Sequence, residues 1–116
     1  MQIPKPSESD KATFRSLVPD DPRVEVKPMF GNLGGFVNGN MFMGLFGSQV
    51  GVRLAPDDAA MLLGVEGAGP FGPAERPMGG YVSLPDGLLG TPDAGRWVAR
   101  GLAHVAAMPP KGTAKR

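Results

Sequence analysis

The sequence predicts an α+β domain: an antiparallel sheet of about five strands with helices packed on one face, in the order α-β-β-β-β-α-β-α. Four segments between residues 23 and 54 have the alternating or apolar pattern of strands, and glycine-containing turns separate them. Such short turns allow only antiparallel pairing. Segments with the apolar spacing of helices flank these strands, and each helix must bury its apolar face against the sheet.

Length and charge exclude several classes of protein. The chain has 116 residues, enough for one domain with a single core, and its formal net charge is +1. A strong nucleic-acid binder usually has a basic surplus, so direct DNA binding is expected to be weak at most. No apolar run is long enough to span a bilayer, and the first residues are too polar for a signal peptide. We therefore expect a cytoplasmic protein without membrane contact.

The two ends of the chain are predicted to lie outside the folded domain. Residues 1–8 are polar and contain two prolines, which is typical of a disordered tail. The domain is predicted over residues 9–110. It begins with a helix from Asp10 that Ser9 caps and Pro19 ends. Residues 111–116 are basic and are predicted to form a second disordered tail.

The first strands are predicted over residues 23–30, 36–38, 41–46 and 49–54, with a glycine-rich break over 31–35. Asn38-Gly39 is the strongest hairpin signal, because a type I′ turn needs positive φ at both central residues. The segment 41–46 is apolar on both faces: Met41, Met43 and Leu45 alternate with Phe42 and Phe46. This pattern is typical of a central strand, or of a strand with one face against a partner.

The second half of the chain alternates helix, strand and helix. Pro56 begins a helix with acids in its first turn, and Gly64 ends it. Residues 65–77 are predicted to form a loop and residues 78–84 a strand. Thr91 is the predicted N-cap of a last helix that runs to about Met108.

No catalytic constellation emerges from the sequence. Residues 67–72 match G-x-G-x-x-G, but a dinucleotide site needs a strand before this motif and a helix after it. Here a helix precedes the motif, and Pro70 and Pro73 prevent a helix from starting there. Without cysteine and with His104 as the single histidine, thiol catalysis and a multi-histidine zinc site are excluded. We expect no enzyme, no cofactor and no metal.

One candidate site consists of apolar residues that exceed the needs of one side of a small sheet. They are Met29, Phe42 and Phe46. Either they belong to a fully buried central strand, or they form the interface of a homodimer.

A second candidate site consists of polar residues predicted around one face of the sheet. Arg53, Arg76 and Tyr81 could contact an anion or another small ligand there. They could equally be outer-face residues of an ordinary sheet.

An ordered series of short motifs runs through most of the chain. In order, the pieces are Val24, Met29-Phe30-Gly31, Gly34, Phe36, Gly39-Asn40-Met41-Phe42, Val52-Arg53-Leu54, Pro70-Phe71, Met78, Tyr81, Pro85, Trp97, Ala103 and Met108-Pro109-Pro110-Lys111. No single piece is specific, but their order resembles the N-terminal domain of the TfoX/Sxy family, bacterial proteins linked to natural competence. Asn32 departs from the family pattern, which often has a glycine there, and is expected to change only the turn.

The resemblance implies an α+β fold with an antiparallel sheet and a regulatory or protein-interaction role without catalysis. The better-known competence regulators carry a second, C-terminal domain, which this chain is expected to lack, and act with the cyclic-AMP receptor protein at promoters. The expected partners are therefore a second copy of the chain in a homodimer and a protein of the transcription machinery. The alternative is a small-molecule or anion-binding module with a pocket on the sheet face.

Overall fold

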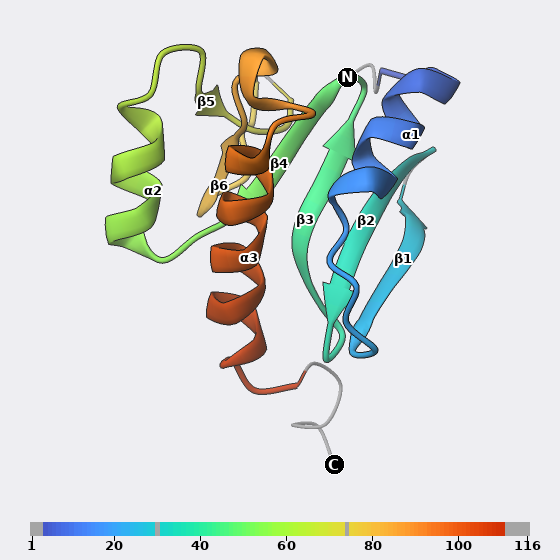
Figure 1. The fold of residues 1–116 in the computed structure, drawn as a ribbon, viewed down its shortest axis with the longest axis vertical. Coiled ribbons are helices and arrows are strands. Elements are labelled where there is room, and N and C mark those ends of the chain that lie inside the picture. Colours follow the sequence, from blue (N-terminus) through green and yellow to red (C-terminus); the bar gives the residue numbers. More distant parts are fainter. Residues whose placement is uncertain (1–3, 30, 74, 111–116) are drawn as a thin grey trace.

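A computed structural model describes residues 4–29, 31–73 and 75–110 of the chain (Figure 1). The strands of these residues form one antiparallel sheet in the order β1-β2-β3-β4-β6-β5, which confirms the predicted class. The elements are α1 (Glu8–Leu17), β1 (Val24–Met29), β2 (Asn32–Val37), β3 (Asn40–Phe46), β4 (Gln49–Arg53), α2 (Pro56–Leu63), β5 (Gly69–Pro70), β6 (Tyr81–Ser83), a 3₁₀ helix η1 (Asp86–Leu88) and α3 (Pro92–Ala106).

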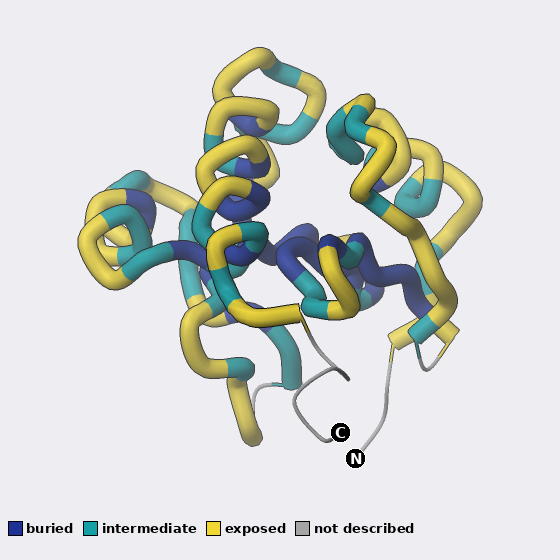
Figure 2. Tube along the Cα trace, turned by 90° about the horizontal axis from the view of Figure 1, so that it is seen from below, coloured by how far each residue is buried: buried dark blue, intermediate teal, exposed yellow. Residues whose placement is uncertain are grey.

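The helices cover one face of the sheet, and the core lies between the two layers. Phe14 of α1, Leu62 of α2 and Val98 of α3 are fully buried there (Figure 1). Helix α3 packs against β3 and β4 so closely that a Cβ at Gly101 would lie 2.3 Å from the Val52 side chain. In Figure 2 the buried residues are concentrated where strands and helices meet, and exposed residues occupy the outer turns.

Helix α1 begins two residues earlier than predicted. Ser7, not Ser9, is its N-cap: the Ser7 hydroxyl accepts from the Asp10 backbone N–H at 3.0 Å, and the Asp10 carboxylate accepts from the Ser7 N–H at 2.9 Å. This reciprocal capping box satisfies two backbone donors at once, which explains why Ser7 caps the helix and Ser9 does not. The predicted tail over residues 1–8 is also wrong for residues 4–8, since the Pro4 carbonyl accepts from the Asn32 side chain at 3.1 Å. Residues 1–3 and 111–116 lie outside the described residues.

The predicted glycine break at residues 31–35 is mostly strand. β2 begins at Asn32 and includes Gly34 and Gly35, where the missing side chains make room for neighbours. A Cβ at Gly35 would lie 2.7 Å from the Met43 side chain, and one at Gly34 would lie 2.9 Å from the Phe36 ring. These glycines therefore serve packing within the sheet.

A β-bulge interrupts the alternation of β3. Gly35 pairs with Met43 and Phe36 pairs with Met41, so Phe42 is an extra residue without a partner on β2. Phe42 and Met43 are consequently both fully buried in the core. The prediction that Phe42 and Phe46 share a face is wrong, because one extra residue changes the face of everything beyond it.

Other boundaries differ by a few residues. The strand predicted over 78–84 is shortened to β6, because Gly80 has a φ of 83°, which belongs to a turn. The segment predicted as a loop over 65–77 contributes the two-residue strand β5. The Asn38-Gly39 turn is confirmed, with φ values of 54° and 81°. Phe30, the end of the first predicted strand, lies outside the described residues.

Candidate functional site

The face of the sheet opposite the helices, here called the open face, is built around three glycines on neighbouring strands. Gly44 of β3 pairs with Gly34 of β2 on one side and with Gly51 of β4 on the other. The ring of Phe71 lies against two of these glycines, Gly44 and Gly51. A Cβ at Gly51 would lie 2.2 Å from the Phe71 ring, and one at Gly44 would lie 3.2 Å from it. The glycines therefore replace side chains of the sheet with one aromatic ring from a distant loop.

Phe71 is held in this position from several sides. Its ring contacts Phe46 edge-on, with centroids 6.4 Å apart, and Tyr81 at 5.9 Å. Its carbonyl accepts from the Met78 N–H at 2.8 Å, which closes the loop that follows. Only 3% of Phe71 is exposed, although it projects from a loop. The loop between β5 and β6 is thus part of the open face.

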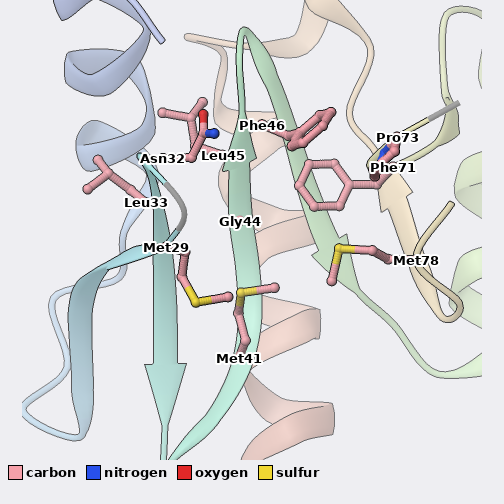
Figure 3. Close-up of a pocket in the computed structure, with 10 residues that line it drawn as sticks. All are labelled: Met29, Asn32, Leu33, Met41, Gly44, Leu45, Phe46, Phe71, Pro73 and Met78. Carbon is pink, nitrogen blue, oxygen red and sulfur yellow. The ribbon is translucent and has the colours of Figure 1, made fainter. Parts of the chain in front are cut away.

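Beside Phe71 the open face contains a pocket of about 290 Å³ (Figure 3). Met29 and Met41 converge at one end of it, and the rings of Phe46 and Phe71 lie together at the other. The lining residues come from β1, β2, β3 and the loop after β5, and nearly all are apolar. They are Met29, Asn32, Leu33, Met41, Gly44, Leu45, Phe46, Phe71, Pro73 and Met78.

Asn32 is the one polar side chain among the described residues that line the pocket, and its amide is already satisfied. Its Oδ1 accepts from the Gly47 N–H at 2.8 Å, and its Nδ2 donates to the Pro4 carbonyl at 3.1 Å. Asn32 is 4% exposed, so these bonds repay the cost of burying it. The pocket therefore offers apolar contact and no group that could act as an acid, base or nucleophile.

Two of the three residues predicted to contact an anion lie together on neighbouring strands. Arg53 of β4 is the cross-strand partner of Tyr81 of β6. The Tyr81 hydroxyl donates to the Met41 carbonyl at 2.9 Å. Burial raises the pKa of Tyr81 above its ordinary value, and the positive charge of Arg53 opposes this shift. A tyrosine hydroxyl therefore contacts the backbone of Met41, which lines the pocket, although Arg53 and Tyr81 are not themselves lining residues.

Arg76, the third residue of that prediction, belongs to a different element. It is exposed in the loop between β5 and β6, where its backbone N–H donates to the Pro73 carbonyl at 3.0 Å. Within the described residues, no hydrogen bond joins its side chain to Arg53 or Tyr81. A joint ligand contact by Arg53, Arg76 and Tyr81 stays a prediction.

The three apolar candidates lie in two different environments. Met29 and Phe46 line the pocket and are partly exposed, whereas Phe42 is fully buried in the core. For Phe42 the alternative of a buried central strand is the one observed, so its side chain is not available to an interface. A homodimer contact through Met29 and Phe46 stays a prediction.

The sequence pattern does not predict Met41, Phe71 and Met78 as site residues. Strict alternation placed Met41 on the face opposite Phe46, because nothing in the local pattern marks the bulge. Phe71 and Met78 belong to an irregular loop without apolar periodicity. A signal was present in Gly44 and Gly51, which leave room for an incoming ring.

Two further features are absent from the described residues. The described residues contain no group of three or more histidine, aspartate or glutamate side chains that could hold a metal ion. Over the same part of the chain, no helix has both the length and the apolar character needed to cross a membrane.

Comparison with known proteins agrees with the order of motifs in the sequence. The family model described as the TfoX N-terminal domain matches residues 16–105. That span includes every described strand and all the residues that line the pocket. No curated protein and no solved structure matches the chain. Since the family model covers most of its length, the chain belongs to the TfoX N-terminal domain family.

Proposed function

We propose that this domain is a non-catalytic regulatory module that binds another protein through the open face of its sheet. The observation that carries the proposal is the pocket formed by methionine and phenylalanine side chains on a face that no helix covers. Methionine and aromatic residues are enriched at protein interfaces, and the flexible thioether adapts to differently shaped partners. Contiguous apolar surface on a small domain marks an interaction site more often than an accident of composition.

The partners we propose are those suggested by the family resemblance. One is a protein of the cytoplasmic transcription machinery, with RNA polymerase and the cyclic-AMP receptor protein as the first candidates. The other is a second copy of the chain, whose Met29 and Phe46 would be covered by the same residues of its partner. Direct DNA binding is not the proposed activity, because the chain has a net charge of only +1.

A pair of methionine substitutions tests the proposal. Met78→Glu places a charge at the pocket, whereas Met61→Glu places the same charge on α2, where Met61 is 57% exposed. We expect Met78→Glu to abolish capture of purified RNA polymerase or receptor protein, and Met61→Glu to leave it intact. Equal capture by both variants would exclude the open face as the binding surface.

The homodimer requires its own measurement. Light scattering after size exclusion should give twice the monomer mass for the wild type and for Met61→Glu, and the monomer mass for Met78→Glu. A monomer mass for the wild type at high concentration would rule out the homodimer and leave the proposal of another protein partner open.

A further inference from the structure

A cation, Arg53, lies near Met41, one of the residues that line the apolar pocket. β3 and β4 pair through Met43 and Val52, so the next residue of β4, Arg53, comes alongside the bulge that follows Met41. On its other side Arg53 faces Tyr81, whose hydroxyl reaches the Met41 carbonyl at 2.9 Å. Met41 itself lines the pocket. Arg53 does not line the pocket itself, but Tyr81 links it to Met41, which does.

The charge of Arg53 has no acidic partner among the described residues. Among the described strands, Lys27 is the other cation, and it lies 3.8 Å from the Glu25 carboxylate and above the Phe36 ring. Arg53 has no carboxylate within ion-pair distance in the described part of the chain. Its known neighbour is the hydroxyl of Tyr81, which burial keeps in the neutral form.

We propose that the pocket binds a free amphipathic carboxylate, with an aliphatic or aromatic body in the hollow and the carboxylate on Arg53. Guanidinium groups bind carboxylates through two parallel hydrogen bonds. The apolar side chains of the pocket offer no such donors. This inference goes beyond the protein-binding role and does not depend on it, because a free acid is tested without any protein partner.

The volume and the lining limit the ligand further. At ~30 Å³ per non-hydrogen atom, a pocket of about 290 Å³ accepts a body of roughly ten such atoms. This is the size of a medium-chain fatty acid or of an arylalkanoic acid. The body must lack polar groups, because the amide of Asn32 is already satisfied. The backbone of a peptide would fit poorly inside the pocket, since its buried amides would have no hydrogen-bond partners there, so a protein partner would contact the pocket with side chains.

The methionines of the chain report on occupancy. Three of them, Met29, Met41 and Met78, line the pocket, whereas Met43 is buried in the core and Met61 is exposed on α2. In the full chain with ¹³C-labelled methionine methyl groups, titration with decanoate should shift the first three resonances saturably below about 1 mM. The resonances of Met43 and Met61 serve as internal controls and should move little.

The role of Arg53 is tested by comparing two ligands and two variants. Arg53→Gln should weaken decanoate binding by about tenfold, the low end expected for a charged hydrogen bond, and leave binding of 1-decanol unchanged. Arg96→Gln, which removes an exposed arginine of α3, should bind both ligands as the wild type does.

Several outcomes would overturn the proposal. If decanoate leaves the three pocket methyl groups unshifted, or shifts Met61 to the same extent, the pocket is not a site for this class of ligand. If decanoate and 1-decanol bind equally, or Arg53→Gln binds decanoate normally, the carboxylate does not lie on Arg53. None of these results bears on capture of a protein partner, so the two proposals fail independently.

Discussion

The two faces of this sheet are made by alternate residues of the same strands, yet they are built in opposite ways. On the helix-covered face, Val50 and Val52 of β4 are buried among the side chains of the helices. On the open face, the residue between them is Gly51, and the space above it belongs to Phe71. A surface pocket can therefore be made by omitting side chains from a sheet and placing one ring from a distant loop over the gap.

The largest expected effect is on the free energy of unfolding, which should differ between substitutions on the two faces. Phe42→Ala removes a fully buried ring from the core and should lower the free energy of unfolding by about 3–5 kcal/mol. Phe46→Ala removes a partly exposed ring at the pocket and should cost only about 1–2 kcal/mol. Urea denaturation of both variants measures the difference. Equal losses would show that Phe46 belongs to the core as much as Phe42 does.

A second pair of substitutions tests how the glycine row holds the ring. Gly51→Ala adds a Cβ that would lie 2.2 Å from the Phe71 ring, so the ring must move, at a cost of about 1–3 kcal/mol. In the Phe71→Ala background the same change should be nearly neutral. A double-mutant cycle in urea should therefore give a coupling of about 1 kcal/mol or more. Additive losses would mean that the glycine is needed for another reason.

The smallest expected effect concerns the hydroxyl that ties β6 to β3. Tyr81→Phe leaves the ring against Phe71 but removes the donor to the Met41 carbonyl, which should cost about 1 kcal/mol. Urea denaturation at neutral pH measures this loss. An unchanged free energy of unfolding would mean that water replaces the hydroxyl without cost.

The same residue makes part of the stability depend on pH. Burial raises the pKa of Tyr81 in the folded protein, so the stabilisation is fully present below the unfolded-state pKa of about 10. It is lost as the pH rises through the folded-state pKa. The chain has one tyrosine, so ultraviolet absorbance of its phenolate follows this titration directly. We expect the alkaline loss of stability to be smaller in Tyr81→Phe than in the wild type.

The parts of the fold that the sequence predicts are those decided by local chemistry. Asn38-Gly39 specifies a hairpin because both residues adopt positive φ, and Pro56 begins a helix because its fixed φ suits the first turn. Alternation also predicts β4 within one residue at its end. These features depend on neighbours along the chain, which the sequence displays.

The pocket depends on neighbours in space and is less accessible to such reasoning. Met29, Met41 and Phe71 come from three separate segments, and no local pattern brings them together. Arg53 and Tyr81 were placed on one sheet face correctly, because both belong to regular strands on which alternation holds. Phe42 was placed on the wrong face because a bulge depends on contacts with another strand.

The bulge at Phe42 has a consequence for how this surface tolerates change. Met41 and Gly44 are separated by an odd number of positions, so in a regular strand they would lie on opposite faces. The bulge takes up one extra residue, so Met41 and Gly44 lie on the same face of the sheet, where both line the pocket. Loss of Phe42 would remove the bulge and leave Met41 and Gly44 two positions apart, so both would still lie on the open face, while the core would lose a buried ring. The bulge therefore adds a phenylalanine to the core without changing which residues form the open face.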